Sequence, residues 1–214
     1  MKKTFLHIIS FIFCFVLLFS SSTIVYAADF FPETEIVGVL TTEDGTQHII
    51  KGELVSNNAN TRTALPNDYY QTYKFNIPAE PKAGGGDSTI YDEDPHLTST
   101  VYSTISYITR NNSLGEKEYL LTGVSGYWII TDPKTIVESA EITYGCSIVP
   151  QSSQSVTRTV RNSFNYSTGF TQYVKKSYTA VLGMNMTIDY LLGNNLRWSF
   201  TLENNLFNEP AMTT

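Results

Sequence analysis

The stretch TAVLGMNMTIDYLLGNNLRWSFTLE, Thr179–Glu203, decides the fold, because apolar and polar residues alternate through it on both sides of a Gly-Asn turn. The even positions carry the apolar residues Ala180, Leu182, Met184, Met186, Ile188, Tyr190, Leu196, Trp198, Phe200 and Leu202. Side chains alternate between the two faces of a β-strand, so each half has one apolar and one polar face. Gly193 to Asn195 tolerate the positive φ angles of tight turns. The stretch therefore predicts an antiparallel hairpin.

Similar alternation recurs along the chain, and no helical period follows residue 28. We expect strands at 35–42 and 47–55 around an Asp44-Gly45 turn, at 69–77, at 99–109 and 118–130 as a second hairpin, and at 135–149. The predicted fold is all-β: an antiparallel β-sandwich or open barrel, preceded by a short β-rich N-terminal extension.

Two of these strands allow a face to be assigned. In 69–77 one side is predicted to carry Tyr69, Tyr73, Phe75 and Ile77. In 135–149 one face is predicted to carry Ile136, Ala140, Ile142, Tyr144, Cys146 and Ile148. Only Glu138 interrupts that second face.

The first 28 residues are typical of a cleaved bacterial secretory signal peptide. Lys2 and Lys3 precede an apolar run, Phe5–Phe19, and small residues then lead to Ala27 and Ala28. A membrane-spanning helix needs about 20 apolar residues, and this run is shorter. We therefore expect cleavage near Ala27 or Ala28, a secreted protein, and no transmembrane segment after that removal; an uncleaved anchor is the alternative.

The sequence divides the remaining chain into three parts. Residues 29–80 form a small β-rich segment, residues 81–98 a linker rich in Gly, Pro and acids, and residues 99–214 the sandwich-like domain. Two or three strands are marginally stable alone. The N-terminal segment is therefore expected either to dock on the main domain or to form a loosely tethered sheet.

Charge excludes one class of partner. The leader holds two of the 14 basic residues and none of the 20 acids, which gives the mature chain a net charge of −8. Phosphate backbones are bound by clustered Lys and Arg, so nucleic acid is not an expected partner. The same charge disfavours electrostatic adsorption to an anionic membrane.

No metal or cofactor is predicted. The linker acids Asp87, Asp92, Glu93 and Asp94 suggest calcium, but their spacing does not match a calcium loop, and Pro95 follows at once. We interpret the segment as a hydrated joint. The histidines of the mature chain, His48 and His96, lie in separate segments from the single cysteine, Cys146, which argues against zinc.

No residue stands out as catalytic. The motif GVSG at Gly123–Gly126 departs from the nucleophile-elbow spacing and lies within a predicted strand. A Cys146–His96 dyad is conceivable, but Cys146 falls on an apolar face, where cysteine behaves as a small hydrophobe. An enzyme is therefore the less favoured class.

Aromatic residues are the candidate binding surface. Five of them fall in the hairpin predicted at 99–130: Tyr102, Tyr107, Tyr119, Tyr127 and Trp128. Exposed rings mark binding sites and stack on sugars or on partner side chains. The alternative is that these rings complete a second sheet packed in the sandwich.

These observations predict an exported, non-catalytic bacterial protein that acts by surface recognition at or outside the cell envelope. Its expected partner is a cell-wall glycan or an envelope protein. Two alternatives remain: a secreted hydrolase with carboxylate or Cys chemistry, and a membrane-active toxin or a protein that protects against one. The last rests on the amphipathic hairpin at 179–206, because pore-forming proteins insert such hairpins.

Overall fold

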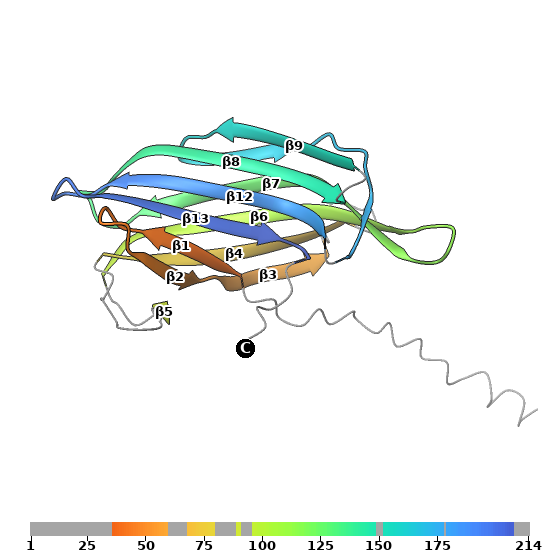
Figure 1. Ribbon diagram of the computed structural model, residues 1–214, viewed down its shortest axis with the longest axis horizontal. Helices are drawn as coiled ribbons and strands as arrows, with labels where there is room; N and C mark the ends of the chain where they lie inside the picture. Colours follow the sequence, from red (N-terminus) through yellow and green to blue (C-terminus); the bar gives the residue numbers. More distant parts are fainter. Residues whose placement is uncertain are drawn as a thin grey trace, which may run out of the picture. The chain divides into compact units, whose positions relative to one another are not determined.

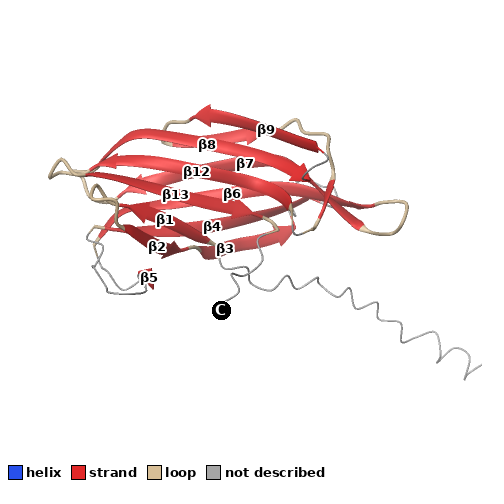
Figure 2. Cartoon of the chain, in the orientation of Figure 1, coloured by secondary structure: helices blue, strands red, loops and turns tan. Residues whose placement is uncertain are grey.

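The computed structural model describes residues 36–59, 68–79, 89–90, 96–148, 152–177 and 179–207. Regular structure in these residues is entirely β, arranged in two sheets (Figures 1 and 2). The all-β prediction is therefore confirmed. The predicted signal peptide, residues 1–28, lies outside the described residues. The part of the chain that the structure describes holds no helix long and apolar enough for a bilayer crossing.

The first sheet has seven strands in the order β5 (Thr89–Ile90), β2 (Gln47–Lys51), β1 (Val37–Thr41), β13 (Arg197–Asn205), β12 (Ala180–Leu191), β8 (Ile136–Ile148) and β9 (Ser152–Thr159). Its neighbours are antiparallel except β2 and β5, which pair in parallel.

The second sheet has six strands. Five follow the order β10 (Ser163–Ser167), β7 (Lys117–Ile130), β6 (Leu97–Asn111), β4 (Asp68–Pro78) and β3 (Glu53–Ala59), and β11 (Val174–Lys175) pairs with β7 beside β10. All of its pairings are antiparallel.

The predicted hairpins are confirmed. Strands β12 and β13 pair from Gly183 with Asn205 to Leu191 with Arg197, and β6 pairs with β7 along almost its whole length. Strands β1 and β2 form the third hairpin. Its turn uses Gly45 at a φ of 82°, a left-handed conformation that glycine adopts without steric strain.

Strand β8 departs from its predicted face at one end. The register of β8 with β12 shifts between Asp189 and Tyr190. Ser139 pairs with Asp189 and Val137 pairs with Tyr190, so Glu138 between them has no partner residue on β12. This bulge reverses the alternation. Ile136 is therefore 60% exposed, and its assignment to the same face as Ala140, Ile142, Tyr144 and Cys146, which are buried, is wrong.

The apolar faces of the two sheets are buried against each other. The ring of Phe75 on β4 lies 5.6 Å from that of Phe200 on β13, measured between centroids. Burying one such side chain stabilises a fold by about 1.5–3 kcal/mol. The largest fully buried side chains come from both sheets: Tyr144, Tyr190, Phe75, Phe200, Ile36, Leu40, Ile77, Ile105, Leu121, Ile142, Leu182 and Met186.

Buried polar groups join the sheets at fixed points. The amide nitrogen of Asn204 on β13 donates to the carbonyl oxygen and to the hydroxyl of Ser103 on β6, at 3.1 and 3.0 Å. Its oxygen accepts a hydrogen bond from Gln71 on β4, at 3.2 Å. Ser99 and Tyr190 also share a hydrogen bond, 2.9 Å between their oxygens. These bonds fix how one sheet lies on the other.

Strands from both sides of the predicted linker share the two sheets. Strand β1 pairs with β13, and β4 pairs with β6. The N-terminal strands thus extend sheets that the C-terminal strands begin. Most of the predicted linker, residues 81–98, lies outside the described residues.

We predict that Asn204→Leu destabilises the protein by roughly 2–4 kcal/mol, because it leaves Gln71 and Ser103 buried without their partner. The midpoint of urea unfolding measures this change. Asn185→Leu, at an exposed position on the same hairpin, is the control. Equal midpoints for the two variants would contradict the role assigned to Asn204.

We also predict that Gly183→Ala destabilises the protein by about 2 kcal/mol or more, because a β-carbon there would lie 2.0 Å from the backbone oxygen of Asn204. Gly123→Ala is the matched control, since its nearest neighbour, the Tyr166 oxygen, would be 3.4 Å away. Thermal unfolding of both variants separates them. A Gly183→Ala protein as stable as Gly123→Ala would show that the strands relax without penalty.

Candidate functional site

The five aromatic residues predicted to form a binding surface do not lie together. Tyr107, Tyr119 and Trp128 are at most 9% exposed and belong to the interior. Tyr127 is 44% exposed, and Tyr102 is half-buried on the same outer face. Of the five, the surface therefore retains only Tyr102 and Tyr127.

Strand geometry explains this division. Odd positions of β6 point inward from Ser99 to Thr109, so Tyr107 is buried and Tyr102 faces out. The β6–β7 register shifts between Ser106 and Tyr107, and this irregularity lets both Tyr119 and Trp128 of β7 point inward despite their opposite parity. Inside, Tyr107 stacks on Tyr69 at 5.5 Å, which makes it part of the core.

Tyr102 and Tyr127 form one unit on the outer face of the six-stranded sheet. They are directly paired across β6 and β7, and their rings are stacked at 4.4 Å between centroids and 12° between planes. Such cross-strand aromatic pairs stabilise a sheet by about 0.2–1 kcal/mol. Each ring covers one face of the other, which leaves one face of each ring outside the stack.

Hydroxyl and amide groups border the tyrosine pair on one side, and Ile129, which is 52% exposed and paired with Thr100, lies in the row on the other side. Ser163 of β10 is paired with Tyr127. One row along the sheet, Thr104 and Ser125 are paired, and Asn165 is paired with Ser125. We call the surface formed by Tyr102, Thr104, Ser125, Tyr127, Ser163 and Asn165 the tyrosine platform.

The tyrosine platform carries no formal charge of its own. Lys74 of β4, paired with Tyr102, has its ammonium 3.2 Å from the carboxylate of Glu53. That ion pair is part-exposed, and such pairs contribute little to stability, but it neutralises Lys74. On the other side of the platform, Arg161 is exposed and forms a β-bridge with Ser163. The six platform residues themselves are uncharged, so the surface suits a ligand with apolar C–H groups and hydroxyls.

A second surface feature lies on the outer face of the seven-stranded sheet. Gly145 and Gly183 are paired across β8 and β12, and both line a shallow hollow of about 250 Å³. Its walls include Thr143, Ser147, Ser153, Ser155 and Asn185. In the sequence, Gly183 lies on the polar face of its predicted strand. Only its pairing with Gly145 shows that the two glycines lie together at this hollow.

Hydroxyl groups in and beside this hollow bond to one another. Thr143 lies 2.8 Å from Thr157, and Thr187 lies 3.1 Å from Thr201, measured between their Oγ1 atoms. Ser139 donates to Asp189 at 2.5 Å. Hydroxyls that already have partners offer less to a ligand, which holds equally for Thr104 of the tyrosine platform, bonded to Thr72.

Cys146 is buried, as its apolar face predicted. It is 1% exposed, and its thiol lies 3.8 Å from the carbonyl oxygen of Gln172. Burial raises the pKa of the Cys146 thiol above its ordinary value, so the thiol stays protonated near neutral pH. A protonated, buried thiol is a poor nucleophile.

Cys146 and His96 lie at opposite ends of the sheets. Cys146 is paired with Leu182 at one end of β12. His96 precedes β6 near Ser99, whose hydroxyl contacts Tyr190 at the other end of β12. Eight residues separate Leu182 from Tyr190, which is about 27 Å along an extended strand. The Cys146–His96 dyad considered from the sequence therefore does not form.

Metal-ligating side chains do not gather in the part of the chain that the structure describes: no group of three or more His, Cys, Asp or Glu residues there is arranged to hold an ion. The linker acids Asp87, Asp92, Glu93 and Asp94 lie outside the described residues. A calcium site formed by these acids therefore stays an untested alternative from the sequence analysis.

We predict that Cys146 of the folded protein reacts with a thiol reagent at least about 100-fold more slowly than the same thiol in urea, because its pKa is raised and its sulfur is covered. Absorbance during reaction with a disulfide dye measures the rate. Ser153→Cys in a Cys146→Ala background places a thiol on an exposed strand position and should react rapidly. Rapid labelling of native Cys146 would show that the site opens.

No family model matches this chain, and neither the curated proteins nor the solved structures that were searched include a match to it. A function has to be inferred from the residues and their geometry.

Proposed function

We propose that this protein is an exported, non-catalytic recognition protein that binds an uncharged envelope polysaccharide through the tyrosine platform. We further propose that its two sheets form an antiparallel β-sandwich that serves as a rigid support. The observation that carries the proposal is the stacked Tyr102–Tyr127 pair, exposed on an outer sheet face. The export expected from residues 1–28 supplies the extracellular setting.

The chemistry of the platform supports a sugar ligand. A pyranose ring has a C–H face, which packs on an aromatic ring, and equatorial hydroxyls, which need hydrogen-bond partners at the edge of that contact. Ser125 and Asn165 provide such groups in the neighbouring row, next to Thr104, whose hydroxyl bonds to that of Thr72 at 2.9 Å. A flat sheet face accommodates an extended polymer.

Charge supports an uncharged polymer. The chain has more acids than bases, and the only cation paired beside Tyr102 is Lys74, which Glu53 neutralises. Anionic polymers are attracted by clustered Lys and Arg, which the platform lacks among the described residues. The net charge also disfavours approach of a polyanion.

The position of the amphipathic hairpin argues against membrane insertion. Strands β12 and β13 lie inside the seven-stranded sheet, between β8 and β1. Releasing them would break the ladders to both neighbours and expose Met186, Ile188 and Phe200, which are at most 1% exposed. The hairpin therefore acts in the core, which favours recognition over membrane activity.

We predict that Tyr127→Ala and Tyr102→Ala each weaken polysaccharide binding about ten-fold or more, because truncating a central aromatic residue removes at least about 1.4 kcal/mol of binding free energy. The mature protein is first screened on immobilised neutral polysaccharides and purified cell walls. The affinity for the best ligand is then measured by calorimetry.

Tyr173→Ala is the matched control, because Tyr173 contacts Arg110 through its ring and lies away from the platform. Circular dichroism confirms that each variant is folded. Unchanged affinity in both platform variants, or binding to envelope proteins and to no glycan, would refute the proposal.

A further inference from the structure

The two sides of the Tyr102–Tyr127 pair differ in chemistry. Residues two positions apart share a face of a strand, so the neighbours of Tyr127 on the outer face of β7 are Ser125 on one side and Ile129 on the other. Such neighbours lie about 7 Å apart along the strand. The ring pair therefore lies between a polar row and an exposed aliphatic residue on one continuous surface.

The polar side offers hydroxyl and amide groups to a ligand. Ser125 is paired with Asn165 across β7 and β10, and Asn165 is exposed. Within the part of the chain that the structure describes, neither side chain is tied up in a hydrogen bond. A hydroxyl and an amide can both donate and accept, so together they suit the hydroxyls along one edge of a sugar ring.

The other side is apolar because of Ile129. This residue is 52% exposed, whereas its partner on β6, Thr100, is only 9% exposed. The hydroxyl of Thr100 donates to the side-chain oxygen of Asn76, at 3.4 Å. A single exposed aliphatic residue is common on protein surfaces, but Ile129 is the diagonal cross-strand neighbour of Tyr102, a position within reach of an aromatic ring. The apolar surface of the rings thus continues onto Ile129.

This asymmetry distinguishes ligands by the group at one edge of the sugar ring. A hydroxyl held against Ile129 would lose its hydrogen bonds to water, and an aliphatic side chain offers no replacement. A methyl group in the same place would instead gain from leaving water. The surface therefore favours a sugar with hydroxyls on one edge and a methyl-bearing substituent on the other.

The spacing of the positions on β7 favours an acetamido substituent. A methyl group bound directly to a sugar carbon stays close to the ring. In an acetamido group, the ring carbon and the methyl carbon are the two ends of a trans amide and lie about 3.8 Å apart, as successive Cα atoms do. An acetamido methyl therefore extends over about half of the distance between neighbouring positions on the face.

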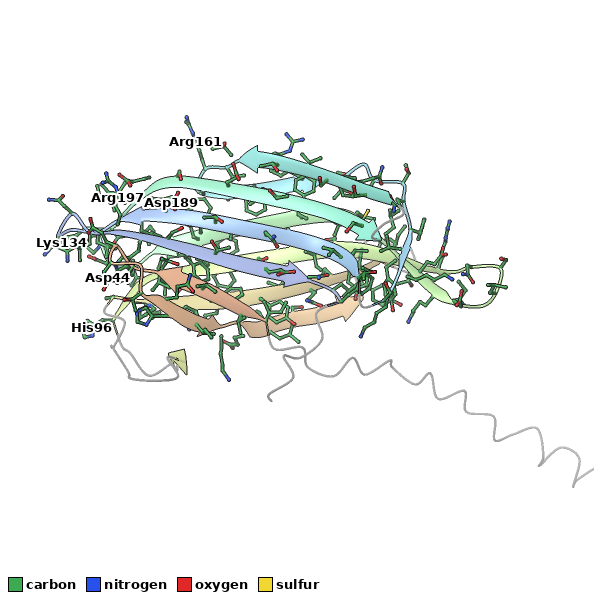
Figure 3. The ribbon with its side chains drawn as sticks, viewed as in Figure 1. Asp44, His96, Lys134, Arg161, Asp189 and Arg197 are labelled. Carbon is green, nitrogen blue, oxygen red and sulfur yellow. The ribbon has the colours of Figure 1, made fainter. Side chains whose placement is uncertain are left out.

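The charges around this surface are compatible with an acetamido group, which is neutral. The row that contains Ile129 is completed by Thr100 and Asn76, so it carries no formal charge. Arg161, which Figure 3 labels beyond the end of β9, forms its β-bridge with Ser163 and not with β7. Its cation is therefore at the far side of the platform from the row of Ile129.

We propose that Ile129 makes the tyrosine platform selective for polysaccharides built from acetamido sugars. A sugar ring packs on the exposed surface of the tyrosine pair, its hydroxyls bind Ser125 and Asn165, and the acetamido methyl packs on Ile129. The inference rests on the proposed function and deepens it, because it names the substituent that the polymer carries.

Calorimetric titration of the mature protein with two hexasaccharides tests the proposal. The chitin and cellulose hexasaccharides have the same linkage and are both uncharged. They differ at one ring position, where chitin carries an acetamido group and cellulose a hydroxyl. The chitin hexasaccharide is expected to bind at least about four-fold more tightly, which is the effect of burying one methyl group.

Two matched variants assign the preference to Ile129. Ile129→Thr keeps a β-branched side chain on the strand, and it should weaken binding of the chitin hexasaccharide about three-fold or more and remove the preference over cellulose. Ile136→Thr is the control, because Ile136 is also an exposed isoleucine on a strand, at 60%, but belongs to the seven-stranded sheet. This control should retain the preference in full. Circular dichroism confirms that both variants are folded.

Three results would overturn the inference: no binding of the chitin hexasaccharide, equal affinity for the two hexasaccharides, or the same preference in Ile129→Thr and Ile136→Thr. Tyr127→Ala separates this failure from failure of the proposed function. If both hexasaccharides bind equally and both lose affinity in Tyr127→Ala, the platform binds polysaccharide without the selectivity. If Tyr127→Ala leaves their binding unchanged, the platform itself is wrong.

Discussion

Phe75 and Phe200 are in contact between the two sheets. The rest of the structure depends on this packing of one sheet against the other. A sheet in water has one face that must be buried, and here each sheet buries its apolar face against the other. The buried hydrogen bonds of Asn204 and of Tyr190 then fix the relative position of the sheets. With that position fixed, every strand residue points either into the shared interior or out to solvent.

The packing of the two sheets also determines which side chains cover the outer faces. Because period-two alternation sends Val, Leu, Ile and most rings inward, Thr, Ser and Asn cover the outside. Departures from that rule are few enough to interpret individually. The Tyr102–Tyr127 pair adds ring surface to a polar face, and the Gly145–Gly183 pair removes side chains from one. The first departure carries the proposed function because the ring pair reaches the surface beside hydroxyl and amide side chains.

The sequence by itself determined the local structure. Alternation of apolar residues predicted the β12–β13, β6–β7 and β1–β2 hairpins, the inward face of β4 and the burial of Cys146, because these depend on neighbours a few residues away. The sequence also marked the place where the face assigned to Ile136 is wrong, because Glu138 interrupts the apolar face of β8 at the bulge that turns Ile136 outward.

Tertiary structure alone decided the sites and the joining of the strands. The pairing of β1 with β13 and of β4 with β6 links residues more than a hundred and about thirty positions apart, and no local pattern encodes such partners. For the same reason the sequence grouped five rings that the register of β6 on β7 divides into a buried set and an exposed pair. Alternation fixes which residues share a face, but the second sheet fixes which face is buried, and therefore which residues remain available to a ligand.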